Sequence, residues 1–294
     1  ENGRYFRRYV ENASIKCGDR EKIMYVLKDI LSRYGLRAKK SLGQNFILDT
    51  NLLHKIAKTA LAGLQPAVVL EVGPGPGGLT QALLEQGVPR LVAIEKDDCC
   101  AQALQELKQD YPALTLIHDD ALAFDEKTLG DPICVVANLP YNVSTVLLVK
   151  WLKEVHLFSR LTLMFQKEVA DRLAAGPGDD AYGRLSVLVG WLCDVSIEMI
   201  LPPSVFTPAP KVTSALVRLT PKGNPFPGVS FALMEKVTAA AFGQRRKMLR
   251  SSLKSLGDPA ALCEAAGIDS SLRAEDVPVE AFCKMALYLQ GEQK

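Results

Sequence analysis

The sequence predicts a doubly wound α/β fold with a mostly parallel sheet, followed by a small all-helical domain. Three observations predict it. Short apolar runs alternate regularly with helical stretches, these runs are apolar enough to be covered on both faces, and strand signals stop beyond Pro221. With 294 residues, of which 48% are hydrophobic and 23% charged, the chain is long enough for one large domain or two unequal ones.

The first two elements are predicted to be helices. Apolar residues at three- and four-residue spacing predict a helix over about 19–33, which Gly35 ends. A basic stretch at 33–40 leads into a second helix over about 50–62. From there the hydrophobic period changes to that of strands.

The middle of the chain alternates between strands and helices. Short β-branched or apolar runs predict strands at 67–72, 91–95, 114–118, 133–137 and 161–165. Helical stretches separate and follow them, near 78–87, 98–109, 143–155 and 166–174. A loop at 176–180 interrupts this pattern, and two further strands at about 195–201 and 214–219 complete the sheet.

The last part of the chain is helical. Pro225 and Pro227 mark a linker, after which helices are predicted near 230–243, 245–255, 259–266 and 278–290. We therefore divide the chain into an N-terminal extension with a helix (1–35), an α/β domain (36–221) and a helical domain (222–294).

Composition excludes several classes of protein. No apolar run approaches the roughly 20 residues of a membrane-spanning helix, so we expect no transmembrane segment. The net charge of +2 predicts neither a nucleic-acid partner nor a membrane surface by itself. Seven scattered cysteines without a Cys-x-x-Cys pair favour reduced thiols, and we expect no metal site. The chain does not begin with Met and has no signal-peptide pattern, so residues 1–19 are a processed start, an expression remnant or a genuine extension.

A glycine-rich segment follows the first predicted strand. Glycines at 73, 75 and 78 allow a tight turn and a close approach to a ligand, with a helix N-terminus behind them. Glu95 ends the second strand 22 residues after Gly73, which is the spacing at which an acid accepts hydrogen bonds from ribose hydroxyls. The two features together predict a nucleotide-type cofactor site in a Rossmann-like sheet.

Two details favour S-adenosylmethionine (AdoMet) over a nicotinamide cofactor. Pro74 and Pro76 remove backbone N–H groups that a pyrophosphate would use. Glu71, just before the loop, suits a cationic methionine better than a diphosphate. Neither detail is decisive, so a nicotinamide oxidoreductase remains an alternative at this point.

A second motif follows the strand at 133–137, where α/β enzymes place their chemistry. It consists of Asn138, Leu139, Pro140 and Tyr141, which are our catalytic candidates. The Asn138 side-chain carbonyl and a backbone carbonyl held out by Pro140 together accept both hydrogens of an exocyclic amine, which aims the nitrogen lone pair at an electrophile. Tyr141 offers a face on which a base stacks. The structural alternative is an Asn-capped turn with a buried tyrosine.

With this motif the sequence resembles the KsgA family of ribosomal RNA adenine N6,N6-dimethyltransferases, from about residue 36 to the end. Six segments carry the resemblance in order, at 40–46, 71–80, 119–122, 138–141, 206–214 and 242–250. The first four resemble, in turn, the N-terminal AdoMet motif, the glycine motif, the adenine-contacting motif and the catalytic motif of the family. The resemblance implies a methyltransferase domain over 36–221 and an RNA-binding domain over 222–294.

The resemblance also implies a set of AdoMet contacts, made by Asn45, the backbone at Ile47, Gly73, Glu95, Asp120 and Asn138. Asp120 would bond the amino group of the cofactor adenine, and Glu95 the ribose. Tyr141 and Phe206 would sandwich the target base. Leucine is usual in the family where Ile47 stands, and the change is harmless if the contact is made through the main chain.

The implied reaction is in-line attack of adenine N6 on the AdoMet methyl, performed twice on each target base. Because the sulfonium is already activated, the protein supplies alignment and electrostatics more than acid–base chemistry. We therefore interpret His54, His118 and His156 as structural. Adenine N6 is out of reach inside a helix, so the target is flipped or already unpaired.

A basic run at 242–254 contains no acid and predicts a phosphate-binding surface. Helical spacing places residues 246, 250 and 254 on one face, although a solvated helix face is the alternative. The RNA-binding candidates are Arg37, Lys39, Lys40, Lys211, Arg245, Arg246, Lys247 and Arg250. We expect a monomer that binds small-subunit ribosomal RNA or an assembling small subunit, with no membrane partner, in a bacterial cytoplasm or an organelle.

Three alternatives remain beside dimethylation of adjacent adenosines near the small-subunit RNA 3′ end. The same chemistry on large-subunit RNA, of the macrolide-resistance type, is less favoured because of segment 242–250. A mainly non-catalytic ribosome-assembly or transcription factor is less favoured because 138–141 is intact. A nicotinamide oxidoreductase explains neither 138–141 nor the basic run. The number of adenines modified, and naked RNA versus a particle as substrate, stay open.

Overall fold

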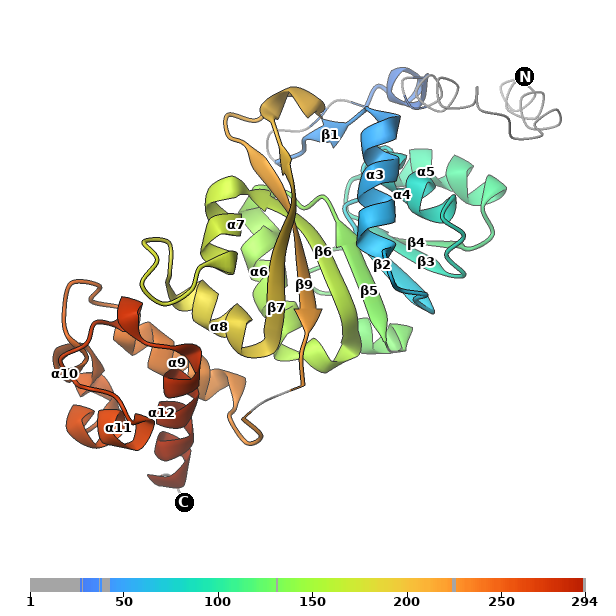
Figure 1. The fold of residues 1–294 in the computed structure, drawn as a ribbon. Helices are drawn as coiled ribbons and strands as arrows, with labels where there is room; N and C mark the ends of the chain where they lie inside the picture. Colours follow the sequence, from blue (N-terminus) through green and yellow to red (C-terminus); the bar gives the residue numbers. More distant parts are fainter. Residues whose placement is uncertain are drawn as a thin grey trace.

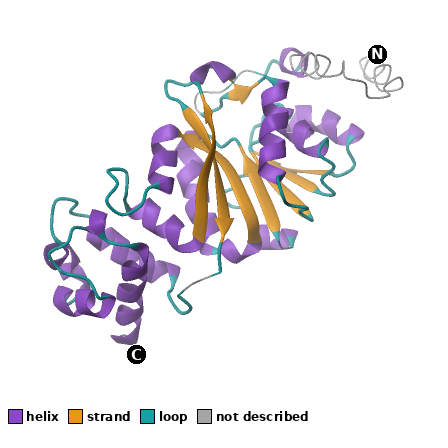
Figure 2. Ribbon diagram, in the orientation of Figure 1, coloured by secondary structure: helices purple, strands orange, loops and turns teal. Residues whose placement is uncertain are grey.

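A computed structural model describes residues 27, 29–36, 38, 43–130, 132–223 and 226–292. Among these residues, a seven-stranded sheet forms the centre of the molecule in the order β4-β3-β2-β5-β6-β9-β7 (Figures 1 and 2). Its strands are β2 (Val68–Val72), β3 (Leu91–Glu95), β4 (Leu114–His118), β5 (Ile133–Ala137), β6 (Phe158–Gln166), β7 (Cys193–Leu201) and β9 (Ser214–Pro221). The five strands β4, β3, β2, β5 and β6 each pair in parallel with the next one in this order, and β9 is antiparallel to both β6 and β7. The predicted mostly parallel, doubly wound sheet is confirmed.

Both faces of the sheet are covered, because the side chains of its central strands are apolar whichever face they point to. Val69 and Val136 belong to one apolar cluster, while their chain neighbours Leu70 and Val135 belong to the other. The first cluster includes residues of α3 (Thr50–Leu61), α4 (Gly78–Leu84) and α5 (Asp98–Asp110). The second includes residues of α6 (Tyr141–Lys153), α7 (Lys167–Ala174) and α8 (Arg184–Leu192). Each cluster is therefore the core on one side of the sheet.

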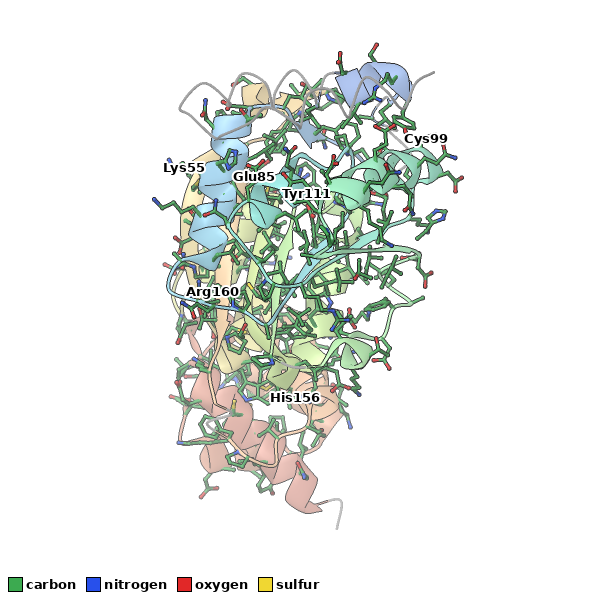
Figure 3. All side chains as sticks on the ribbon, turned by 90° about the vertical axis from the view of Figure 1, so that its right-hand side faces the viewer. Lys55, Glu85, Cys99, Tyr111, His156 and Arg160 are labelled. Carbon is green, nitrogen blue, oxygen red and sulfur yellow. The ribbon has the colours of Figure 1, made fainter. Side chains whose placement is uncertain are left out.

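Helix α3 is held at both ends. At its start the Asp49 side chain accepts a hydrogen bond from the Leu52 amide. At its end Arg160 of β6, labelled in Figure 3, donates to the carbonyl oxygens of Ala60 and Ala62 at 3.1 and 2.7 Å. A cation at a helix C-terminus satisfies the unpaired carbonyls and opposes the helix dipole, so the arginine fastens α3 to the sheet.

The C-terminal helices pack on the sheet domain through α8. They are α9 (Phe231–Phe242), α10 (Leu249–Ser252), α11 (Pro259–Ala266) and α12 (Val279–Glu292). Their apolar residues join the same cluster as α6, α7 and α8. Tyr182, before α8, donates from its hydroxyl to the Val277 carbonyl at 2.9 Å, and its ring meets that of Phe242 edge-on. The helices form a separate group in Figure 1, and the boundary at 222 stays a prediction.

The prediction of one continuous helix over 245–255 is wrong, although the span from Leu249 onward is helical. The chain turns through 244–247, helix α10 begins at Leu249, and a 3₁₀ turn covers Leu253–Leu256. The reason is that the amides of Leu249 and Arg250 donate to the carbonyls of Leu272 and Ser270, so they do not make bonds to the preceding turn. Residues 246, 250 and 254 therefore do not share one face of a continuous helix.

Other elements were not predicted as such. The apolar run at 184–192 is helix α8, and β1 (Phe46–Ile47) pairs antiparallel with β8 (Phe206–Thr207). Further 3₁₀ turns lie at Glu126–Leu129, Val155–Leu157, Pro203–Val205 and Ala274–Asp276. Of the predicted first helix, residues 29–33 are helical and Gly35, at φ +57°, ends it; positions 1–26 lie outside the described residues. No helix in the described part of the chain is long and apolar enough to cross a membrane.

Candidate active site

A pocket lies at the carboxyl ends of the parallel strands, on either side of the point where the strand order reverses between β2 and β5. Its lining comes from 43–47, 71–79, 94–96, 119–122 and 138–143. It brings together all six predicted cofactor residues, which are Asn45, Ile47, Gly73, Glu95, Asp120 and Asn138. The predicted residues Leu139, Pro140 and Tyr141 line it as well.

The glycine loop is shaped by backbone that other residues rarely adopt. Gly73, Gly75 and Gly77 have φ values of +68°, +56° and +90°. A Cβ atom on Gly75 would lie 3.0 Å from Cε1 of the Phe46 ring, so β1 closes over the loop. A Cβ atom on Gly73 would lie 4.0 Å from the Asn138 carbonyl oxygen, so the loop faces the second motif. Glycine at these positions therefore lets the loop pass close to Phe46 and to the second motif.

Glu95 joins strand β3 to the glycine loop. Its Oε2 atom accepts a hydrogen bond from the Gly75 amide at 2.9 Å, and Oε1 accepts one from the Asp97 amide at 2.8 Å. Burial raises the pKa of this carboxyl, and the backbone donors act in the opposite direction. The sequence placed this acid and the loop at the same edge of the sheet, although it did not predict the hydrogen bond between them.

Asp120 lies in the loop after β4 and lines the pocket. The Lys96 ammonium contacts its Oδ2 atom at 2.7 Å, and the Leu122 amide donates to Oδ1 at 2.9 Å. The hydrogen bond from Lys96, followed by that from Leu122, holds the pKa of the Asp120 carboxyl below its usual value. Lys96 was not predicted, and its position directly after Glu95 is the signal that could have found it.

Glu71 is buried beneath the glycine loop with 1% of its surface exposed. Loss of water around the carboxyl raises its pKa to about 8; the neighbouring Thr80 hydroxyl acts in the opposite direction, and the negative charge of Glu95 adds to the rise. Its buried Oε2 atom has no hydrogen-bond partner within the part of the chain that the structure describes. A buried acceptor without a partner favours occupation by a cation or donor of a ligand.

The burial of Glu71 predicts a pH-dependent stability in the ligand-free protein. Because its pKa is raised in the folded state, the free energy of unfolding falls as pH rises from about 4.5 to about 8. We expect Glu71→Gln to remove this loss, with an upper bound on the order of 3 kcal/mol at pH 7. Urea unfolding of both proteins from pH 5 to 9 measures it. Glu264→Gln, at an exposed site on α11, is the control, and a Glu71→Gln effect that does not vary with pH contradicts the prediction.

The second motif is held by contacts to distant parts of the chain. The Nδ2 atom of Asn138 donates to the Asn45 carbonyl at 3.0 Å, which leaves Oδ1 as the acceptor of that amide. The Pro140 carbonyl accepts the amides of Val143 and Ser144, so the motif itself starts helix α6. The first contact fixes Asn138 Oδ1 as an acceptor at the pocket wall, and the second fixes the backbone of the motif.

Tyr141 is the first residue of α6 and is half-buried. Its hydroxyl is 2.5 Å from the Ser214 Oγ atom at the start of β9, and burial raises its pKa. The bond holds the edge of the ring while the ring lines the pocket. Ser214 was not predicted as a site residue, although it ends the segment 206–214 that the resemblance singled out.

Phe206, Lys211 and the three histidines do not line the pocket. Phe206 is 4% exposed and pairs with Ile47 across β1 and β8, so it adjoins the pocket through that strand. Lys211 is exposed on the loop before β9. His54, His118 and His156 lie beside the carboxylates of Glu85, Asp98 and Glu154, outside the pocket.

The predicted RNA-binding residues of the C-terminal region are exposed but not equivalent. Arg245 lies 3.2 Å from Glu275 and also donates to the Asp180 carbonyl, so it ties the loop before α8 to the C-terminal helices. Arg246 and Lys247 lie in the exposed turn, and Arg250 is exposed on α10. Three further candidates, Arg37, Lys39 and Lys40, lie outside the described residues.

Comparison with known proteins gives a consistent set of similarities. Residues 35–291 match the family model described as ribosomal RNA adenine dimethylase. The chain is 54% identical over 267 residues to the ribosomal RNA small subunit methyltransferase A of Xanthobacter autotrophicus, covering 88% of this chain and 92% of that protein. It is 54% identical over 265 residues to the protein of the same name from Rhizobium meliloti, covering 88% and 96%.

Two solved structures share the fold over most of their length. A dimethyladenosine transferase from Plasmodium falciparum superimposes with a TM-score of 0.70 at 25% identity, covering 83% of this chain and 96% of that one. The 23S rRNA methyltransferase ErmE superimposes with a TM-score of 0.65 at 25% identity, covering 84% and 100%. In sequence, the chain is more similar to the two small-subunit methyltransferases, at 54% identity, than to either solved structure, at 25%.

Proposed function

The chain belongs to the ribosomal RNA adenine dimethylase family, and we propose that it transfers methyl groups from AdoMet to the N6 atom of adenines near the 3′ end of small-subunit ribosomal RNA. The family predicted from the six sequence segments is confirmed. The arrangement of the pocket supports this proposal. A single pocket holds the glycine loop, the acid at the end of β3, Asp120 and the motif at 138–141.

The residues of the pocket fit AdoMet. The buried Glu71 Oε2 atom that lacks a partner among the described residues suits the ammonium of the methionine portion. Asp120 and Glu95 line the same pocket, and we propose that they accept hydrogen bonds from the adenine amino group and the ribose, respectively. We propose that the cofactor is held by Asn45, Ile47, Gly73, Glu95, Asp120 and Asn138. When bound, AdoMet supplies a methyl group that its sulfonium has already activated.

The side chains at 138–141 orient the acceptor base. Asn138 Oδ1 and a carbonyl of the motif accept the two hydrogens of adenine N6, so the nitrogen lone pair points away from them and toward the methyl group. Once N6 carries the new methyl group, its proton is acidic and passes to water, so no strong base is required in the protein. Tyr141 stacks on the base, and Phe206 remains our proposal for its second face.

The small-subunit substrate is favoured by the relatives, because the two reported above at 54% identity are named small-subunit methyltransferases, while ErmE is 25% identical. We propose that the protein is a monomer. We also propose that it acts in a bacterial cytoplasm, because the relatives come from bacteria. The decisive test offers radiolabelled AdoMet with undermethylated small subunits or with large-subunit RNA, and maps modified adenines by reverse-transcription stops. Label as N6,N6-dimethyladenine near the small-subunit 3′ end supports the proposal. Label confined to large-subunit RNA, or binding without label, contradicts it.

We propose that Arg246 in the exposed turn binds RNA phosphate. We expect Arg246→Glu to weaken binding of small-subunit RNA and to lower the slope of log affinity against log salt by about 1. The control is Lys55→Glu, which makes the same charge change at an exposed position of α3, far from the C-terminal helices (Figure 3). Filter binding from low to high salt measures both. An unchanged slope for Arg246→Glu would remove this residue from the RNA surface.

A further inference from the structure

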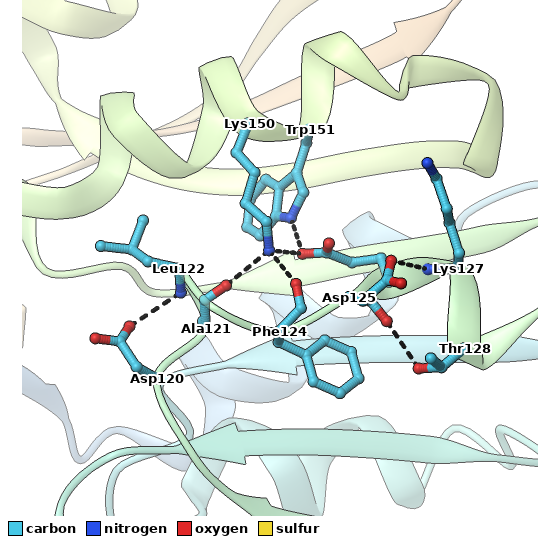
Figure 4. Close-up of polar contacts among 10 residues, drawn as sticks. Asp120, Ala121, Leu122, Phe124, Asp125, Lys127, Thr128, Lys150 and Trp151 are labelled. Carbon is cyan, nitrogen blue, oxygen red and sulfur yellow. Dashed lines mark hydrogen bonds and ion pairs between the residues drawn. The ribbon is translucent and has the colours of Figure 1, made fainter.

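A lysine of helix α6 holds the loop that contains Asp120. The Lys150 Nζ atom donates to the carbonyl oxygens of Ala121 at 2.9 Å and Phe124 at 2.5 Å, and to Glu126 Oε1 at 2.8 Å (Figure 4). An ammonium has three donors, so these contacts use all of them. The side chain of Lys150 is only 27% exposed, which reduces the competition from water for these bonds.

The next residue of α6 strengthens the same attachment. Trp151, 1% exposed, donates from Nε1 to Glu126 Oε1 at 2.7 Å. Glu126 is itself 7% exposed and begins the 3₁₀ turn that follows the loop. A buried carboxylate that accepts from an ammonium and an indole is costly to leave unpaired, so α6 and the loop are joined at a defined distance.

Hydrogen bonds within the loop connect the Lys150 contacts to the Asp120 carboxylate. The amides of Ala123 and Phe124 donate to the Asp120 carbonyl at 2.9 and 3.2 Å, and the Leu122 amide donates to its Oδ1 atom at 2.9 Å. These bonds close the turn around Asp120. The carbonyl oxygens of Ala121 and Phe124 in this turn accept the hydrogen bonds from Lys150 of α6 (Figure 4). Moving the Lys150 contacts would move the turn and the carboxylate with it.

We propose that Lys150 is a positioning residue, which sets Asp120 at the place where the cofactor adenine is recognised. The inference rests on the proposed function, because it takes Asp120 as the acceptor for the adenine amino group. The same helix that contains Lys150 begins at Tyr141. One rigid element thus holds the cofactor-adenine loop and the target-base motif in register with each other.

The test measures recognition of the adenine amino group directly. S-adenosylhomocysteine and its inosine analogue differ at that group, and their dissociation constants are compared by calorimetry. We expect the wild-type protein to prefer the adenine compound by about tenfold or more, because the analogue leaves a carboxylate facing a carbonyl oxygen. Lys150→Met keeps the aliphatic stem and removes the donors, and we expect the preference to fall to about twofold. Asp120→Ala should show the same loss.

A matched control exists on the same helix. Lys153 is 51% exposed and lies 3.7 Å from Glu235, so Lys153→Met removes an ammonium from α6 without touching the loop, and it should keep the wild-type preference. Lys150→Arg keeps the charge beside Glu126, but its planar guanidinium does not converge on three acceptors as an ammonium does. This milder variant should fold even where Lys150→Met does not, with an intermediate preference.

The outcomes separate the inference from the proposed function. A role in stability alone would lower the affinity for both compounds equally, and an unchanged preference in Lys150→Met and Lys150→Arg overturns the inference while the proposed function stands. A wild-type protein that binds neither compound overturns both. A wild-type protein that binds the two equally overturns the assignment of Asp120 and the inference that depends on it.

Discussion

Replacing Asn138 with alanine should lower kcat for methyl transfer by about 10²–10³-fold, the range seen when one preorganised polar group is removed from an active site. The variant loses the Oδ1 acceptor that orients adenine N6. It also loses the hydrogen bond from Nδ2 to the Asn45 carbonyl, which holds the amide in place. We expect the affinity for AdoMet to change far less, because the other five proposed cofactor residues remain.

Single-turnover assays with labelled AdoMet and saturating RNA measure this effect on the chemical step. Gln102→Ala on α5 is the control, since it replaces an exposed amide by alanine in a helix and should leave kcat unchanged. A loss below about threefold in Asn138→Ala would mean that the amide does not orient the acceptor. A loss of AdoMet binding equal to the loss in kcat would make Asn138 a cofactor residue only.

Replacing Tyr141 with alanine should lower kcat/KM for RNA by about 10–100-fold, because base stacking on an aromatic ring contributes about 1–3 kcal/mol. Tyr141→Phe keeps the ring and loses only the hydroxyl that contacts Ser214 Oγ. We expect this second variant to retain most of the activity, with a loss of several-fold at most from a less firmly held ring.

The pair of variants separates stacking from hydrogen bonding. Initial rates at varied RNA concentration give kcat/KM, and Ser214→Ala should reproduce the effect of Tyr141→Phe because it removes the other half of the same bond. Equal losses in Tyr141→Phe and Tyr141→Ala would contradict a stacking role and assign the effect to the hydroxyl. Thermal unfolding of each variant checks that the start of α6 remains folded.

Several features could be predicted from the sequence because their causes are local. The strands at 91–95, 114–118 and 133–137 have the predicted bounds, since each is a short β-branched or apolar run, and the first and third are buried on both faces of the sheet. The sequence also placed the glycine loop and Glu95 at the same edge of the sheet, because adjacent parallel strands end there, although the hydrogen bond between Gly75 and Glu95 was not predicted. The pocket could therefore be placed before any coordinates were known.

The helix predicted over 245–255 shows where local reasoning fails. Its composition and spacing suit a helix, but the amides of Leu249 and Arg250 bond to the loop at 270–272 and the chain turns before α10. Tertiary hydrogen bonds replaced those that a continuous helix would have made. A basic face drawn on a helical wheel was consequently a poor guide to which cations lie together.

By itself the sequence determined the α/β class, the order of the strands along the chain and the residues that meet at the sheet's carboxyl edge. Only the tertiary structure decided which distant groups hold those residues, such as the Asn45 carbonyl for Asn138, 93 residues away, and Ser214 for Tyr141, 73 residues away. The physical reason is the range of the forces involved. Hydrophobic period and backbone preference act over a few neighbouring residues, whereas these hydrogen bonds exist only once the packed sheet and helices have brought their partners within about 3 Å.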